Sequence, residues 1–173
     1  RDRAWQMYRA QVHPGGAWGP ALNVATDAPA FLWRAELAGQ PRDAALWHDL
    51  NAYVGKSFPK PGVAFVEVHR VLAAVADGDR GALEGYVAEL EQRVAAGKAP
   101  SGDVVPRIAR GLIAYAAGDW DRAMVRIGGS RAQRDLVENT LIAACLKAGR
   151  ASDAYKRIEA HTDRRPSVPV AGL

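Results

Sequence analysis

The stretch over residues 111–154 constrains the fold more than any other part of the chain. Small residues stand at Gly111, Gly118 and Ala123, so the steps between them are seven and then five positions. The absence of a side chain at Gly111 lets a neighbouring helix come close, and Gly118 can adopt the left-handed conformation that ends a helix. The carboxylate of Asp119 can then cap the next helix. The pattern predicts two antiparallel helices joined by a tight turn.

The same five-residue step recurs from Gly39 to Ala44 and from Gly149 to Ala154. It is typical of tetratricopeptide-type helical pairs. Glycines that can end helices stand at positions 39, 78, 118 and 149, and their irregular spacing differs from a strict repeat of about 34 residues. The sequence therefore predicts an all-α fold, namely an α-solenoid of irregular tetratricopeptide-like helical hairpins that occupies residues 1–173 as a single domain.

Turn residues divide the chain into the individual helices. The first helix covers residues 3–12, and its apolar face predicts a partner helix before it, so we expect the chain to be the C-terminal part of a longer solenoid. We expect the second helix to be capped by Asp27, with Pro29 in its first turn, and the third to start at Pro41. An extended tail is predicted over residues 164–173. The remaining helices are predicted over residues 63–76, 80–96, 104–117, 120–127, 131–148 and 151–161.

Composition narrows the classes of function. The net charge of +4 comes without a run of five Lys or Arg residues, so we do not expect a nucleic-acid partner. No apolar run reaches the length of about 18 residues that a membrane span needs, so no membrane partner is expected. The only cysteine, Cys145, cannot form an intrachain disulfide and fits a reducing compartment, so we expect a cytoplasmic protein. No cofactor is expected.

Four motifs are more specific than the helical spacing, and they occupy residues 31–39, 65–69, 118–123 and 129–135. They resemble the tetratricopeptide repeat protein 38 family. The fourth motif reads Gly-Ser-Arg-Ala-Gln-Arg-Asp and is the most specific, although Arg131 replaces the histidine of that family. The resemblance covers residues 5–166 and matches only the C-terminal part of a full-length member. It implies an α-solenoid and no particular reaction.

Glu67 and His69 are the best candidates for catalytic residues. They stand two positions apart, so on a helix they point about 200° apart and cannot act as a pair unless another element joins them. One interpretation of His69 is a hydrogen-bonded interior histidine, and the other is a general base in a pocket. No second His or Cys follows at helical spacing, so a metal site is not expected.

A second polar cluster lies where the helix after Gly129 is expected to begin. Ser130 can cap this helix, which is a structural role. Alternatively, Ser130, Arg131, Gln133 and Arg134 present donors at a helix N-terminus, where they can bind an anionic ligand such as a carboxylate or a phosphate. Arg107, near the start of the neighbouring helix, can join them if the hairpins stack.

Two hypotheses of function follow. In the first, the chain is a protein–protein interaction or scaffold module whose concave groove holds a protein or peptide partner, such as the missing N-terminal half or a second copy. In the second, it is an enzyme or small-molecule binder with a polar pocket between hairpins for an anionic ligand. The sequence leaves open whether the protein is an enzyme.

Overall fold

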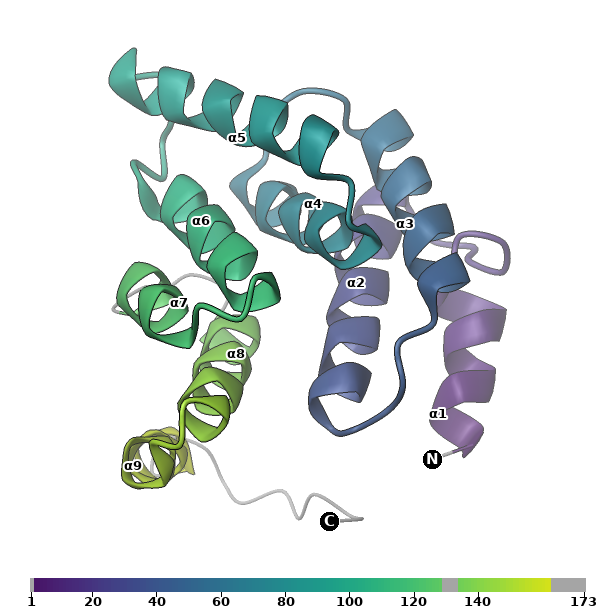
Figure 1. Cartoon of the computed structure of the whole chain (residues 1–173). Coiled ribbons are helices and arrows are strands. Elements are labelled where there is room, and N and C mark those ends of the chain that lie inside the picture. Colours follow the sequence, from purple (N-terminus) through teal and green to yellow (C-terminus); the bar gives the residue numbers. More distant parts are fainter. Residues whose placement is uncertain (1, 129–133, 163–173) are drawn as a thin grey trace.

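The computed structural model describes residues 2–128 and 134–162, and all regular secondary structure in these ranges is helical (Figure 1). The all-α prediction is therefore confirmed, whereas the predicted tail over residues 164–173 lies outside the described residues. The elements are α1 (Asp2–Met7), the π-helical turn η1 (Tyr8–Val12), α2 (Ala21–Leu37), α3 (Ala44–Ser57), α4 (Ala64–Asp77), α5 (Arg80–Ala95), α6 (Val104–Ala116), α7 (Trp120–Ile127), α8 (Arg134–Lys147) and α9 (Ala151–Thr162).

From α2 onward, consecutive helices pack in pairs, namely α2 with α3, α4 with α5, α6 with α7 and α8 with α9. The first helices of neighbouring pairs also touch, since α4 packs against both α2 and α6. In Figure 1, α2, α4, α6 and α8 lie toward the middle of the molecule and their partners lie toward its outside. A further contact joins α2 directly to α8, so the array curls back on itself.

The turn between α6 and α7 has the geometry that the sequence predicts. Gly118 is left-handed with φ of 79°, and the Asp119 carboxylate accepts a hydrogen bond from the Arg122 N–H at 3.1 Å. A Cβ atom on Gly111 would lie 2.2 Å from Cγ1 of Ile127, so only glycine lets α6 approach α7 this closely. Ala123 is fully buried between the two helices.

The prediction for the start of α2 is wrong. The helix begins at Ala21, and both Asp27 and Pro29 lie in its interior. Pro29 lacks an N–H and so removes one helical hydrogen bond. The turn before it is nevertheless helical, because Val24 and Ala25 are buried there and packing outweighs the lost bond.

Two other boundaries also differ from the prediction. The third helix starts at Ala44 rather than Pro41, because the Asp43 carboxylate caps it by accepting from the Leu46 N–H at 3.2 Å. The predicted helix over residues 3–12 is an α-helix only as far as Met7 and continues as the π-helical turn η1. A π-helical turn cannot be read from a 3.6-residue apolar pattern, since it adds a single residue to one turn.

The central helix of the fold is α4. It contacts α2, α3, α5 and α6, and it is buried on nearly all sides. Its only charged or imidazole side chains inside the core are Glu67 and His69. Buried polar groups must be hydrogen-bonded, so these two residues have partners that define their roles. Among the described residues, no helix is long and apolar enough to cross a membrane.

Candidate functional site

His69 is an enclosed imidazole. His69 is only 3% exposed, and its Nδ1 donates a hydrogen bond to the carbonyl oxygen of Phe65 at 2.8 Å. Burial lowers the pKa of His69, although the hydrogen bond to Phe65 and the charge of Asp27 act in the opposite direction. The imidazole is therefore neutral at physiological pH, and this arrangement is the one expected of an interior histidine.

Glu67 faces a different environment from His69. Its Oε1 accepts a hydrogen bond from the Gly62 N–H at 2.7 Å, and the residue is 8% exposed. Burial raises the pKa of Glu67, while the Gly62 hydrogen bond and the charge of Arg93 lower it. Glu67 lines a cavity of 180 Å³ together with Arg93 and Lys98, and His69 is not part of that lining. The two residues therefore do not form a catalytic pair.

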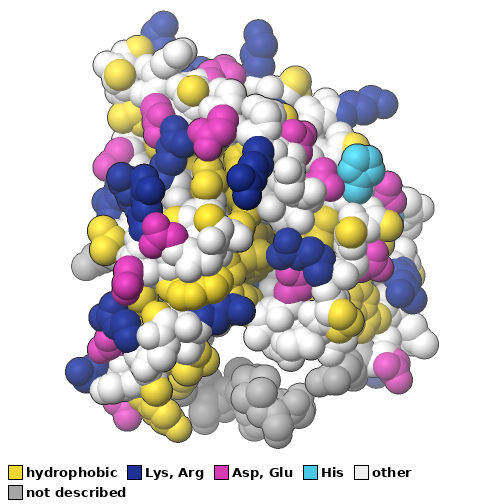
Figure 2. Space-filling view, viewed as in Figure 1, with side chains coloured by type: hydrophobic (Ala, Val, Ile, Leu, Met, Phe, Trp, Pro, Cys, Tyr) yellow, Lys and Arg dark blue, Asp and Glu magenta, His cyan; other side chains and the backbone are white. Residues whose placement is uncertain are grey.

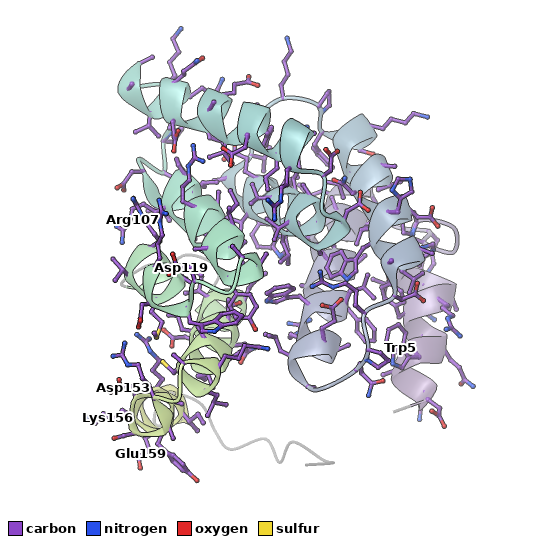
Figure 3. The ribbon with its side chains drawn as sticks, in the orientation of Figure 1. Trp5, Arg107, Asp119, Asp153, Lys156 and Glu159 are labelled. Carbon is purple, nitrogen blue, oxygen red and sulfur yellow. The ribbon has the colours of Figure 1, made fainter. Side chains whose placement is uncertain are left out.

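Arg107 joins the end of α7 to α6. Its Nη2 donates to the carbonyl oxygen of Gly128 at 3.1 Å, and Figure 3 shows the side chain at the outer edge of the molecule. Ser130, Arg131 and Gln133 lie outside the described residues, and so does the side chain of Arg134 at the start of α8. The anion site predicted from these residues therefore stays a prediction. The described members of the predicted pocket, Glu67, His69 and Arg107, are not brought together.

Aromatic side chains bridge the inner side of the helix array. The Trp33 ring of α2 packs edge-on against Tyr115 of α6 at 5.4 Å, and its Nε1 donates to Oγ1 of Thr140 on α8 at 2.9 Å. Tyr115 packs in turn on Trp120 at 5.1 Å, and the Lys147 ammonium lies 5.3 Å from the Trp120 ring centre. Figure 2 shows apolar side chains as a strip in the middle of this face. The chain's own side chains thus occupy part of the groove that the sequence predicts for a partner.

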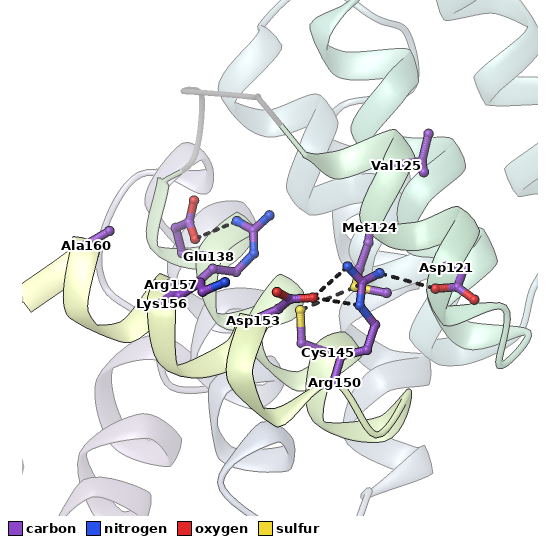
Figure 4. A pocket seen from close by; sticks show the side chains of 10 residues that line it. All are labelled: Asp121, Met124, Val125, Glu138, Cys145, Arg150, Asp153, Lys156, Arg157 and Ala160. Atoms are coloured by element: carbon purple, nitrogen blue, oxygen red, sulfur yellow. Dashed lines mark hydrogen bonds and ion pairs between the residues drawn. The ribbon is translucent and has the colours of Figure 1, made fainter.

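A cleft of 630 Å³ opens instead between α7, α8 and α9 (Figure 4). Charged side chains of both signs surround it, and two sulfur-containing side chains form its floor. The lining residues are Asp121, Met124, Val125, Glu138, Cys145, Arg150, Asp153, Lys156, Arg157 and Ala160. Sequence reasoning missed this site. The available signal was the recurrence of charged residues at positions 150, 153, 156 and 157, which repeat at the spacing of one helix face.

The charges of the cleft are arranged in alternating pairs. Arg150 bonds Asp153 at 2.6 Å and Asp121 at 3.4 Å, so it connects α9 to α7. Arg157 bonds Glu138 of α8 at 3.3 Å. In the part of the chain that the structure describes, Lys156 has no carboxylate within ion-pair distance, and Figure 4 draws it without a dashed line. Among the described lining residues, Lys156 is therefore a cation beside partly exposed ion pairs, which solvent weakens.

Apolar groups lie beside these charges. Sγ of Cys145 and Sδ of Met124 are 3.3 Å apart at the floor of the cleft, and both residues are buried. Val125 lines the cleft and is 76% exposed, and Ala160 of α9 lines it at an exposed position. The cleft therefore presents exposed apolar groups next to its charged side chains.

The lining of the cleft offers charged and apolar groups that can bind a ligand or a partner. No histidine lies among the lining residues. Across the described ranges, no cluster of three metal-ligating side chains occurs. Comparison of the chain with protein-family models, curated proteins and solved structures finds no match. The resemblance to the tetratricopeptide repeat protein 38 family therefore rests on the sequence motifs alone, and the function has to be argued from the geometry.

Proposed function

We propose that the chain is a tetratricopeptide-like helical-repeat module that binds a segment of a partner protein in the cleft between α7, α8 and α9. The succession of helical pairs from α2 to α9 supports the repeat architecture. Stacked helical pairs of this kind usually serve as binding surfaces, because each pair exposes one helix face to a common side.

The observation that carries the proposal is the mixture of exposed apolar groups and alternating charges around one cleft. Val125 and Ala160 supply apolar contacts, and Arg150 and Arg157 supply donors that are already oriented by Asp153 and Glu138. A segment with apolar residues on one face and acidic residues beside them complements this surface. Such amphipathic helices recognise grooves through anchors at one face.

The inner side of the helix array is less suited to a partner protein than the cleft is. The contact between Trp33 and Thr140 joins α2 to α8 across it, so a partner chain would have to separate buried groups. The cleft at α7–α9 requires no such opening. We therefore place the interaction at the outer surface of the last two pairs rather than in a concave groove.

Site-specific photo-cross-linking tests the proposal. Benzoylphenylalanine replaces Val125, which lines the cleft, in the cell that naturally makes the protein, and the expected result is a discrete cross-linked product with one partner. The matched control is the same substitution at Trp18, which is 84% exposed and lies between η1 and α2. Equal products from both positions, or none from Val125, contradict the proposal.

A charge variant adds a second readout. Arg150→Glu should abolish the product at Val125, because it places a carboxylate beside Asp121 and Asp153 and removes the donors. Arg80→Glu, at an exposed position of α5, should leave the product intact. Circular dichroism confirms that both variants fold before the comparison is made.

A further inference from the structure

The cavity beside Glu67 is a separate feature of the molecule. It has a volume of 180 Å³ and lies between α4, α5 and the loop over residues 98–102 that leads into α6. Both charged and apolar groups line it. Its position between three helices gives it fixed walls, unlike the open cleft at α7–α9.

Glu67 supplies the acidic end of this cavity. The Gly62 N–H holds Oε1 at 2.7 Å and so fixes the carboxylate in place. Within the described residues, no protein donor bonds the second oxygen, Oε2. A buried carboxylate with one free oxygen gains most from a charged donor, since hydrogen bonds between ionised groups are the strong ones.

Arg93 and Lys98 supply the basic end. Arg93 is half-buried, and its one hydrogen bond runs from Nη2 to the carbonyl oxygen of Lys98 at a long distance of 3.4 Å. Neither cation has a carboxylate within ion-pair distance in the described part of the chain. Two cations without a carboxylate partner favour an anionic group.

Part of the lining is apolar. Leu90 of α5 and Val105 of α6 are buried and line the cavity, and Pro106 follows Val105 in the chain. A ligand that fills the cavity therefore needs two opposite charges close to each other and a short aliphatic portion beside them. Neither a simple anion nor a simple cation satisfies both ends.

We propose that this cavity binds a small zwitterion of the α-amino acid class, with its ammonium on Glu67, its carboxylate on Arg93 and Lys98, and its aliphatic side chain against Leu90 and Val105. The arrangement satisfies the free carboxylate oxygen and both unpaired cations at once. This site is independent of the proposed protein-binding cleft, because the two share no lining residue.

Isothermal titration calorimetry with the whole chain tests the proposal, and L-leucine is the first probe. The expected result is saturable binding with a dissociation constant of about 1 mM or tighter. Two analogues of leucine isolate the two charges: 4-methylpentanoate lacks the ammonium and 3-methylbutylamine lacks the carboxylate. Each should bind about tenfold more weakly, as expected when a charged hydrogen bond is lost.

Variants locate the binding site. Glu67→Gln keeps an acceptor for the Gly62 N–H and so should fold, but it should weaken leucine binding about tenfold. Lys98→Gln should weaken it as well. The matched controls are Glu159→Gln on α9 and Lys60→Gln, both at exposed positions, and they should bind leucine like the parent.

Three results would overturn the proposal. The first is the absence of saturable binding for glycine, L-valine and L-leucine alike. The second is leucine binding that survives Glu67→Gln unchanged. The third is equal affinity for leucine and 4-methylpentanoate, which would identify an anion site instead. None of these results bears on the cross-linking experiment at Val125, so the two proposals fail separately.

Discussion

The indole N–H of Trp33 donates to the hydroxyl of Thr140 at 2.9 Å across 107 positions of sequence. Both residues are buried, and the bond joins α2 to α8. Thr140 in turn donates to the carbonyl oxygen of Leu136 at 2.7 Å, so every polar atom in this chain of bonds is satisfied. The first complete helical pair is thereby tied to the last one.

Breaking this bond should destabilise the fold. Thr140→Val leaves the Trp33 N–H buried without an acceptor, and we expect a loss of about 1–3 kcal/mol in the free energy of unfolding. Trp33→Phe removes the donor and part of the packing. In a double-mutant cycle measured by urea denaturation, the two losses should be less than additive, because the second change removes a bond already lost. Strict additivity would show that the bond contributes nothing.

Gly111 should tolerate no larger residue. A Cβ there would lie 2.2 Å from Cγ1 of Ile127, so Gly111→Leu should lower the free energy of unfolding by about 1–3 kcal/mol through overpacking. Thermal denaturation measures the effect. Gly111→Leu melting like the parent would mean that α6 and α7 do not pack in this register.

Gly85 provides the matched control for this prediction. It lies within α5, and a Cβ added there would meet no atom within 4 Å. Gly85→Ala should therefore raise the free energy of unfolding by about 0.5–1 kcal/mol, since alanine favours the helix over glycine. The two glycine substitutions should thus have opposite signs.

His69 should make the fold sensitive to acid. Burial lowers its pKa in the folded state, so the unfolded chain binds a proton first as the pH falls below about 6.5. The stability that neutral His69 contributes is fully present above about pH 6.5 and is lost as the pH falls further. Urea denaturation at several pH values should show the loss in the parent and in His48→Asn, whose imidazole is exposed. His69→Asn keeps a donor for the Phe65 carbonyl and should lack this component.

Glu67 should give the opposite pH dependence of stability. Its pKa is raised in the folded state, so above pH of about 4.5 the unfolded chain loses its proton first. The folded state is therefore disfavoured as the pH rises through this range. The stability of Glu67→Gln relative to the parent should grow from pH 4.5 upward, whereas that of exposed Glu159→Gln should not. A constant difference would show that the Glu67 carboxylate is not desolvated.

Local signals predicted the turns between helices better than the helix starts. Gly118 and Asp119 act within one turn, so their roles follow from the residues themselves. The start of α2 could not be found this way, because the burial of Val24 and Ala25 depends on helices far away in sequence. Pro29 is a strong local signal that tertiary packing overrides.

The candidate sites likewise depend partly on local spacing and partly on tertiary packing. The spacing of Glu67 and His69 already separated them onto two sides of one helix, and the structure gives them different partners. The cleft at α7–α9 was not predicted, because Asp121, Glu138 and Asp153 come from three helices whose relative placement no local pattern contains. The cavity beside Glu67 likewise needs the loop before α6 to face α4.

The sequence by itself determined the helical class, the turn at Gly118 and the close approach at Gly111, since helix propensity, left-handed glycine and small side chains act over a few residues. Only the tertiary structure decided that α2 meets α8, that His69 is enclosed and that the cavity beside Glu67 is separate from the cleft at α7–α9. Those outcomes depend on the packing of distant helices, and packing is fixed by the complementarity of whole surfaces rather than by any single motif.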